Sequence, residues 1–205
     1  MSLQNRSTIV NTKPTHVSTI TDEEAGNAIA TLVLAFSTDP VARWMYGDAQ
    51  RYLEHIPRLF RALGTASFEA GAAQRTDDGR GVALWFPPNV HGDDAMFEAI
   101  VAESIADGMQ AEVSALFSQT ELYRPAEPHW YLSLIGVEAL NQNKGCGAAL
   151  LQHGLRRCDQ EHRAAYLWSS NRLNTSLYER HGFVRISTIQ VGSSPSIFPM
   201  LRQAC

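Results

Sequence analysis

The most constraining feature of the chain is residues 130–159, WYLSLIGVEALNQNKGCGAALLQHGLRRCD. This stretch begins with an unbroken apolar run at 130–137, continues through a short polar loop, and reaches the glycine-rich turn Gly145-Cys146-Gly147. The pattern predicts a buried strand, a tight turn and then a helix. Because the first N–H groups of a helix have no intrahelical partner, we expect this junction to bind a phosphate group.

The length and composition are those of a globular protein with one sizeable core. The chain has 205 residues, of which 44% are hydrophobic and 19% charged. These values are ordinary for a soluble domain and argue against a disordered or fibrous chain. We expect a loose tail at residues 1–15 and a single domain at 16–205.

Charge and cysteine content exclude several classes of protein. Lys and Arg number 17 against 21 Asp and Glu, a net charge of −4, with no basic cluster that would attract nucleic acid or an anionic membrane. Cys146, Cys158 and Cys205 are an odd number and lack metal-ligand spacing. The polar N-terminus and the absence of a run of 18 apolar residues argue against export and membrane insertion, so we expect a cytoplasmic protein without a metal site.

The remaining pattern alternates between helices and strands. Helical spacing predicts helices at 21–37, from Pro40, at 51–68, and over 93–117 with a break near Gly108. Apolar runs predict strands at 16–20, 164–169, 182–188 and 196–202, an antiparallel hairpin of 72–76 with 82–86, and a short helix at 174–180. Strands in both halves of the chain predict one α/β sheet.

The glycine-rich turn lacks the two commonest nucleotide-binding patterns. It has no Gly-Lys-Ser/Thr, and Gly-x-Gly-x-x-Gly fails at Leu150. Two segments together are more specific: Val137-x4-Gln142-x2-Gly145-x-Gly147-Ala148, then Asn174-x3-Tyr178-x3-Gly182-Phe183. In this order and separation they resemble the GNAT N-acetyltransferase superfamily.

Within that superfamily the chain is most similar to the puromycin N-acetyltransferase-like group. The similarity lies in His129-Trp130-Tyr131-Leu132, Gly136-Val137, residues 177–183 (LYERHGF) and Met200-x-Arg202. It covers residues 129–183 closely and is faint over the first hundred residues, which should shape the acceptor pocket.

The resemblance implies an α/β (α+β) GNAT fold, with a mixed, largely antiparallel sheet, helices on both faces, and a split between the cofactor-binding strand and the next. It also implies transfer of the acetyl group of acetyl-CoA to a primary amine of a small molecule by direct attack in a ternary complex. The protein would act as a monomer or homodimer. Two alternatives remain: an acyl-CoA-binding sensor without turnover, and a protein or peptide N-acetyltransferase.

The resemblance also assigns the cofactor residues. The pyrophosphate would bind the backbone at Gln142, Asn143, Lys144, Gly145, Cys146, Gly147 and Ala148, with the glycines leaving clearance. Lys144 either adds a positive charge or is an ordinary surface lysine, and Cys146 is interpreted as a small filler. Ile135, Gly136 and Val137 would pair with pantetheine, Gly136 being suited to a bulge, and Asn174 would bond the pantetheine arm.

Tyr178 is the first catalytic candidate, because the resemblance makes it the general acid that protonates the leaving thiolate. Many relatives place a base, Glu, six residues before Val137, where this chain has Tyr131. We expect Tyr131 to hold a water or the substrate amine, with Ser133 on the same side and His129 a more remote candidate. The predicted acceptor pocket consists of Phe36, Trp44, Tyr46 and Phe86, with Asp39 either holding an ammonium group or simply capping a helix.

Overall fold

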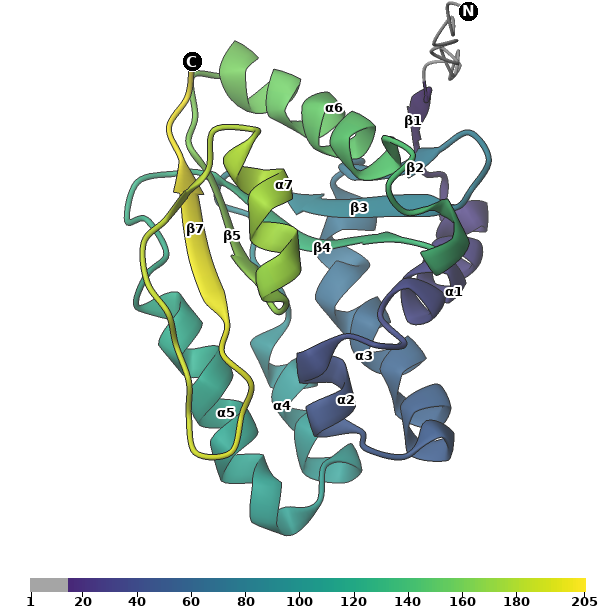
Figure 1. Cartoon of the computed structure of the whole chain (residues 1–205), viewed down its shortest axis with the longest axis vertical. Coiled ribbons are helices and arrows are strands. Elements are labelled where there is room, and N and C mark those ends of the chain that lie inside the picture. The colour runs from purple at the N-terminus through teal and green to yellow at the C-terminus, as the bar shows by residue number, and fades with distance from the viewer. Residues whose placement is uncertain (1–14) are drawn as a thin grey trace, which may run out of the picture.

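A computed structural model of the chain describes residues 15–205, so the tail expected at 1–15 lies outside the described residues except for Thr15. Its central feature is a seven-stranded sheet (Figure 1). The strands are β1 (Val17–Thr19), β2 (Ala73–Thr76), β3 (Gly81–Phe86), β4 (Trp130–Val137), β5 (Ala165–Ser169), β6 (Val184–Arg185) and β7 (Phe198–Arg202). Their order in the sheet is β1-β2-β3-β4-β5-β7-β6.

Every pairing in this sheet is antiparallel except that of β4 with β5. The parallel pairing consists only of Trp130↔Ala165 and Tyr131↔Tyr166, although β4 continues for six more residues. The two strands therefore diverge after Tyr131, as their ribbons do in Figure 1. The predicted mixed, largely antiparallel sheet, with a split between β4 and the next strand along the chain, is confirmed.

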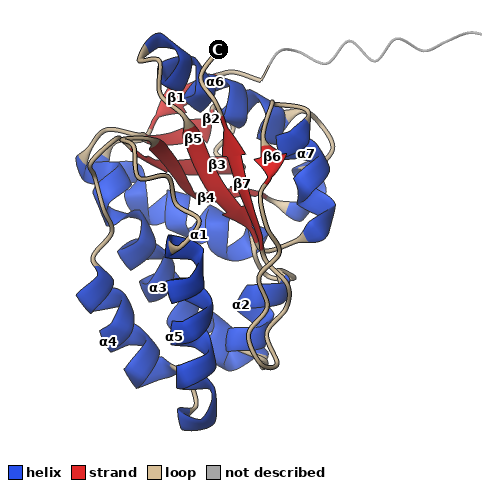
Figure 2. Cartoon of the chain, turned by 90° about the vertical axis from the view of Figure 1, so that its left-hand side faces the viewer, coloured by secondary structure: helices blue, strands red, loops and turns tan. Residues whose placement is uncertain are grey.

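Helices cover both faces of the sheet (Figure 2). Residues up to Glu121, which we call the first half of the chain, supply α1 (Ala25–Ala35), α2 (Pro40–Met45), α3 (Ala49–Glu69), α4 (Asp94–Ser104) and α5 (Asp107–Glu121). The second half supplies α6 (Cys146–Gln160) and α7 (Thr175–Glu179). Short 3-10 turns are η1 (Asp22–Glu24), η2 (Ala139–Asn141) and η3 (Arg172–Asn174).

Aspartates at the N-cap position, directly before the first helical residue, explain where three of the helices begin. The Asp39 carboxylate accepts the N–H groups of Val41 and Ala42 at 3.0 Å each, and Pro40 follows as the first helical residue. Asp48 accepts the N–H of Arg51 at 2.9 Å, and Asp93 that of Met96 at 2.8 Å. These contacts satisfy N–H groups that the helix itself leaves unpaired.

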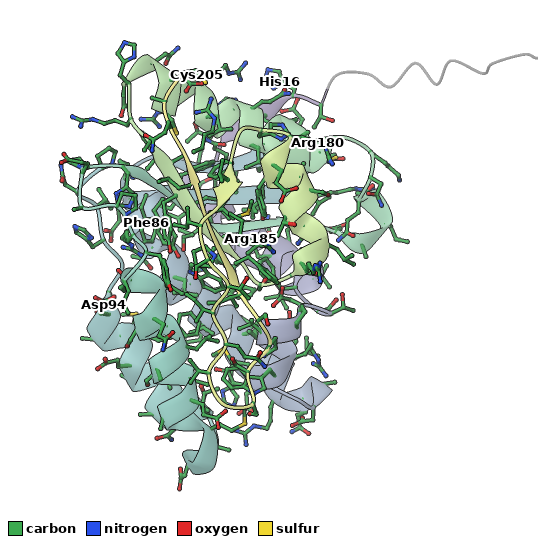
Figure 3. All side chains as sticks on the ribbon, turned by 60° about the vertical axis from the view of Figure 1, so that its left-hand side comes forward. His16, Phe86, Asp94, Arg180, Arg185 and Cys205 are labelled. Atoms are coloured by element: carbon green, nitrogen blue, oxygen red, sulfur yellow. The ribbon has the colours of Figure 1, made fainter. Side chains whose placement is uncertain are left out.

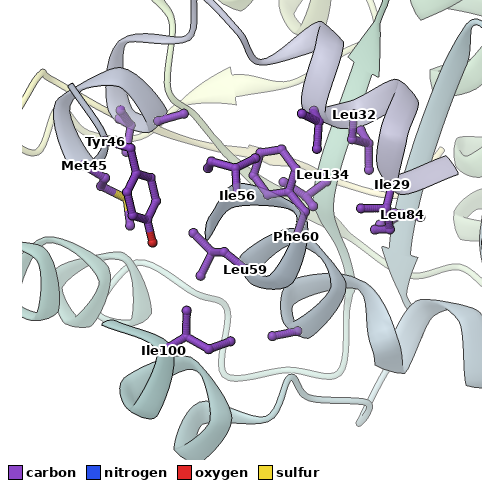
Figure 4. Packing of buried hydrophobic residues seen from close by; sticks show 14 of the residues in the cluster. Ile29, Leu32, Met45, Tyr46, Ile56, Leu59, Phe60, Leu84, Ile100 and Leu134 are labelled. Carbon is purple, nitrogen blue, oxygen red and sulfur yellow. The ribbon is translucent and has the colours of Figure 1, made fainter. Parts of the chain in front are cut away.

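Two buried clusters lie on the two faces of the sheet. One joins α1, α2, α3, α4 and α5 to strand residues such as Leu84 and Leu134 (Figure 4). The other joins Leu150, Leu151 and Leu155 of α6 to Trp85 and Trp130. The sheet is thus buried on both sides where β3 and β4 cross its centre.

One strand is shorter than its pattern predicts. The sequence favours a strand over 182–188, whereas β6 consists of Val184–Arg185 only. The N–H of Ile186 still bonds the carbonyl of Pro199 at 2.9 Å, but Pro199 has no N–H to return the second bond. The ladder therefore ends there. No helix within residues 15–205 is long and apolar enough to cross a membrane.

Candidate active site

Two cavities share walls at the point where β4 and β5 diverge. The larger, which we call the acceptor cavity, has a volume of about 320 Å³ and lies between these strands and helices α2 to α5. The smaller, of about 50 Å³, lies between the two strands, and we call it the strand cleft. Both are lined by Phe36, Ser133, Leu134, Trp168 and Ser170.

The strand cleft brings together three residues singled out in the sequence, Ile135, Asn174 and Tyr178. They come from β4, from the end of η3 and from α7 respectively. Asn174 is exposed, and no hydrogen bond within residues 15–205 uses its side-chain amide. A free amide at the rim of a cleft can bond a ligand that enters it.

Tyr178 is buried against Phe183, with the ring centroids 6.1 Å apart. Burial raises the pKa of the Tyr178 hydroxyl, and the negative charge of Asp39 raises it further. The phenol is therefore neutral near pH 7 and carries a proton that it can donate.

The bulge in β4 lies at Ser133, and the expectation that Gly136 forms it is wrong. Leu134 pairs with Leu84 and Leu132 with Trp85, which leaves Ser133 as the extra residue. Its hydroxyl donates to the carbonyl of Leu63 at 2.8 Å. Gly136 instead pairs regularly with Val82 and serves close packing, since a Cβ there would lie 2.7 Å from that of Ala35.

The other two pantetheine candidates on β4 lie in different surroundings. Ile135 lines the strand cleft and is half-buried. Val137 lies outside the lining of both cavities, and its carbonyl accepts the Gln142 side-chain amide at 3.1 Å. The Gln142 side chain thus links the end of β4 to the loop before α6.

The N-terminus of α6 carries the expected free N–H groups. Asn143 has φ +59° and Gly145 φ +90°, which turns the chain from the loop into the helix. The first hydrogen bond of the helix runs from the N–H of Ala149 to the carbonyl of Gly145, the residue before α6, at 3.0 Å. No side chain within residues 15–205 caps this helix, so the N–H groups of residues 146–148 remain available to an anion.

Gly145 and Gly147 were both expected to leave space for the pyrophosphate, but the structure gives each glycine another role. At Gly145 the space for a Cβ is open, and glycine is required by the left-handed φ. At Gly147 a Cβ would lie 3.3 Å from Cδ2 of Leu177, so its absence lets α7 pack close to α6. Cys146 is buried, which fits the filler interpretation, and Lys144 is exposed.

Aromatic side chains form much of the wall of the acceptor cavity. Phe36 and Phe86 lie there as expected, but Trp44 and Tyr46 do not. The Trp44 indole N–H bonds the Ser193 hydroxyl at 3.1 Å, and the buried Tyr46 hydroxyl pairs with that of Ser104 at 2.7 Å. The aromatic residues that the sequence analysis missed are Phe60, Phe97, Phe117 and Trp168.

Tyr131 faces the acceptor cavity where β4 still pairs with β5. Its ring stacks on Tyr166 at 5.8 Å, and the Arg124 guanidinium lies 4.4 Å above it. Burial raises the pKa of Tyr131 to about 12, so its hydroxyl is neutral near pH 7. His129 lies outside the lining of both cavities, and its Nδ1–H donates to the carbonyl of Glu127 at 2.8 Å.

Asp39 both caps α2 and lines the acceptor cavity. Its Oδ1 accepts the two helix N–H groups, and its Oδ2 accepts the hydroxyl of Ser170. The residue is only 8% exposed. Burial raises the pKa of the Asp39 carboxyl, while these hydrogen bonds oppose the shift.

The mouth of the acceptor cavity is mainly acidic. Asp93, Asp94 and Glu98 lie at the beginning of α4, and Glu121 lies at the end of α5. Figure 3 shows Asp94 on the same side of the molecule as Phe86 of the cavity wall. The basic groups among the lining residues are Arg124, paired with Glu121 at 2.8 Å, and His91. This excess of negative charge favours a cationic ligand.

Comparison with known proteins gives a consistent result. Residues 77–203 match the profile of a family described as acetyltransferase (GNAT) domain. An uncharacterised N-acetyltransferase of Schizosaccharomyces pombe is 28% identical over 173 residues, covering 77% of this chain and 69% of that protein.

Solved structures share the fold. A Corynebacterium glutamicum protein described as histone acetyltransferase HPA2 and related acetyltransferase has a TM-score of 0.69 at 24% identity, over 94% of this chain and 98% of that one. Arylalkylamine N-acetyltransferase 2 of Aedes aegypti has a TM-score of 0.68 at 12% identity, over 94% and 100%.

Proposed function

Because the chain belongs to the GNAT family of acetyltransferases, we propose that it moves the acetyl group of acetyl-CoA to a primary amine of a small molecule. The single observation that carries the choice of acceptor is the aromatic-lined acceptor cavity of about 320 Å³, which shares walls with the strand cleft. Cavities of this size are typical of small-molecule sites. The amine attacks the acetyl group directly in a ternary complex.

Acetyl-CoA is proposed to bind along the split in the sheet. Its pyrophosphate bonds the free N–H groups at the start of α6, in the segment of Gln142, Asn143, Lys144, Gly145, Cys146, Gly147 and Ala148. Its pantetheine arm follows the β4 edge at Ile135, Gly136 and Val137, with Asn174 on the opposite side. The support is the unpaired β4 edge beyond Tyr131 and the uncapped α6 N-terminus.

Tyr178 is proposed as the general acid. Expulsion of CoA leaves a thiolate, and a neutral phenol in the strand cleft can protonate it. Tyr131 is proposed to orient the acceptor, because its neutral hydroxyl belongs to the acceptor-cavity wall. Both hydroxyls are neutral near pH 7, so each is in the protonated form that its proposed role requires.

The proposed acceptor is an amine with an apolar, preferably aromatic, body. Aromatic side chains on α3, α4 and α5 supply the wall, and acidic side chains at the mouth attract the ammonium form. The sequence similarity to the puromycin N-acetyltransferase-like group and the name of the Aedes aegypti structure point to the same chemical class. The name of the Corynebacterium glutamicum structure is the reason to test peptides as well.

A screen for CoA release tests the proposal. Arylalkylamines, puromycin, aminoglycosides, polyamines and lysine peptides would be incubated with acetyl-CoA, and free CoA measured with a thiol reagent. We expect release with at least one small aromatic amine and none with peptides. Release with peptides alone would move the assignment to a peptide acetyltransferase, and acetyl-CoA binding with no release by any amine would indicate a sensor.

Tyr178→Phe tests the general acid. The substitution removes only the hydroxyl, so we expect kcat to fall by about 10²-fold, at the lower end of general-acid effects, with acetyl-CoA affinity unchanged. Tyr123→Phe is the matched control, because Tyr123 is exposed and lines neither cavity. A kcat equal to that of the control would remove Tyr178 from the reaction.

A further inference from the structure

We propose that Asp39 takes the proton from the acceptor ammonium group, with the Ser170 hydroxyl bonding the amine and relaying that proton. This inference rests on the proposed amine acetyltransferase activity and identifies its general base, which neither Tyr131 nor His129 supplies. Asp39 is the buried carboxylate in the acceptor-cavity wall, whereas the other acidic lining residues are exposed at the mouth.

Asp39 and Ser170 meet in the cavity wall from distant parts of the chain. Asp39 lies between α1 and α2, and Ser170 follows the end of β5, 131 residues further along the chain. The hydroxyl of Ser170 donates to Oδ2 of Asp39, so its lone pairs remain available to accept an N–H. Ser170 lines both cavities, so the residue lies at the boundary between the acceptor cavity and the strand cleft.

A carboxylate suits this position because the acceptor must lose a proton before it can attack. An alkylamine with a pKa near ~10 arrives protonated at neutral pH and cannot attack until it loses a proton. The Tyr131 hydroxyl is itself protonated there, since burial raises its pKa to about 12. Burial raises the pKa of Asp39 and so makes it a stronger base than an exposed carboxylate.

The charge of Asp39 also links the base to the acid. The titratable groups whose pKa it raises are Tyr52 of α3 and Tyr178 of α7, and Arg43 opposes the effect at Tyr52. When Asp39 accepts a proton its charge disappears. One cause of the raised Tyr178 pKa disappears with it, and Tyr178 can then release its proton more readily.

The protons and bonds of the reaction balance without another reactant. The ammonium proton passes through Ser170 to Asp39, and the nitrogen lone pair forms a bond to the thioester carbonyl carbon. The C–S bond breaks, its electron pair stays on sulfur, and the Tyr178 proton moves to that sulfur. The second proton of the nitrogen returns to the Tyr178 oxygen, and Asp39 releases its proton to solvent as the amide leaves.

Asp39→Asn is the central variant, because an asparagine oxygen can still cap α2. We expect kcat/KM for an alkylamine at pH 7 to fall by about 10²–10⁴-fold, with acetyl-CoA affinity unchanged. The loss should shrink as the pH rises toward the pKa of the amine, near ~10, because solvent then removes the proton. Asp48→Asn is the matched control, since Asp48 caps α3 at an exposed position outside both cavities.

An acceptor that is neutral at pH 7, such as an arylamine, separates loss of proton removal from loss of structure. With this acceptor, the kcat/KM of Asp39→Asn should lie within about threefold of the wild-type value. Ser170→Ala should also lose kcat/KM mainly with charged acceptors, but by a smaller factor than Asp39→Asn. An equal loss for neutral and charged acceptors, or wild-type activity with alkylamines, would overturn the assignment of Asp39. If none of the amines causes the wild type to release CoA, the proposed amine acetyltransferase activity itself fails. This outcome differs from one in which only the role of Asp39 fails.

Discussion

At the scale of single residues, Arg202 shows how a conspicuous sequence position can have a structural explanation. Arg202 lies in the Met200-x-Arg202 pattern, and in the structure it pairs with Asp159 of α6 through two contacts of 2.7 and 2.9 Å. Its Nε–H donates to the carbonyl of His181 at 3.0 Å. Arg202 is buried and therefore ties β7 to the ends of α6 and α7.

This pair predicts a pH-dependent part of the stability. Hydrogen bonding to Arg202 lowers the pKa of Asp159 below its usual range. A depressed pKa stabilises the folded state above the unfolded value of about 3.9, and this stabilisation is lost as the pH falls toward the folded value. Asp159→Asn should lower the free energy of unfolding by about 1 kcal/mol at pH 7, allowing for its partial exposure.

Urea denaturation of wild type and variant at pH 7 and at about pH 3 measures this effect. The difference between the two proteins should narrow at the lower pH, and an unchanged difference would contradict the linkage. Glu103→Gln is the control, because Glu103 pairs with Arg58 on the surface and should matter less.

At the scale of elements, α6 joins the core to the turn that we propose binds the pyrophosphate. Its apolar side packs on β3, where a Cβ on Gly154 would lie 2.4 Å from the Trp85 ring. Its first turn begins after the left-handed Gly145 and stays uncapped within residues 15–205. The helix is thus fixed by packing along one side, while its N-terminal N–H groups stay open to a ligand.

Bulky residues in this turn should weaken binding of acetyl-CoA. Gly145→Val strains a φ of +90°, and Gly147→Val meets Leu177, so either change moves the N–H groups from their positions. Calorimetry should show a Kd at least about tenfold higher, which corresponds to about 1.4 kcal/mol. Gly108→Val in α5 is the control, since a Cβ there is in open space. Unchanged affinity in the first two variants would remove the turn from the pyrophosphate site.

At the scale of the molecule, the two halves of the chain supply different parts of the site. Helices α2 to α5 of the first half build most of the acceptor cavity, whereas β5 and α7 line the strand cleft, where we propose that the cofactor binds. β4 takes part in both, because Ser133 and Leu134 line the two spaces. Changes on the first half should therefore affect the acceptor and leave the cofactor in place.

Ser114→Phe tests this division. Ser114 of α5 lines the acceptor cavity, so a phenyl group there should raise the KM for the amine by at least about tenfold through lost volume. The Kd for acetyl-CoA should stay within about twofold. Gln119→Phe adds the same group at an exposed α5 position outside the lining. A parallel loss of cofactor affinity in Ser114→Phe would contradict the separation of the two halves.

Local patterns in the sequence determined most of the elements. The apolar run at 130–137 predicted the bounds of β4, and Asp39 and Pro40 predicted the start of α2. The hairpin of β2 and β3 followed from the turn that contains Gly79, whose φ is +70°. These features depend on contacts within a few residues, which is the range over which capping, turn geometry and side-chain alternation act.

Only the tertiary structure decided which residues surround the acceptor and how their acidity changes. It placed the bulge at Ser133, because the register of β4 depends on its neighbour β3. It added Phe97 and Phe117 to the cavity wall and brought Ser170 to Asp39. A cavity wall and a shifted pKa arise from groups far apart in the chain that exclude water together. The sequence alone thus determined the strand, turn and helix of residues 130–159, for which cofactor binding is a prediction, whereas the acceptor side required the packed molecule.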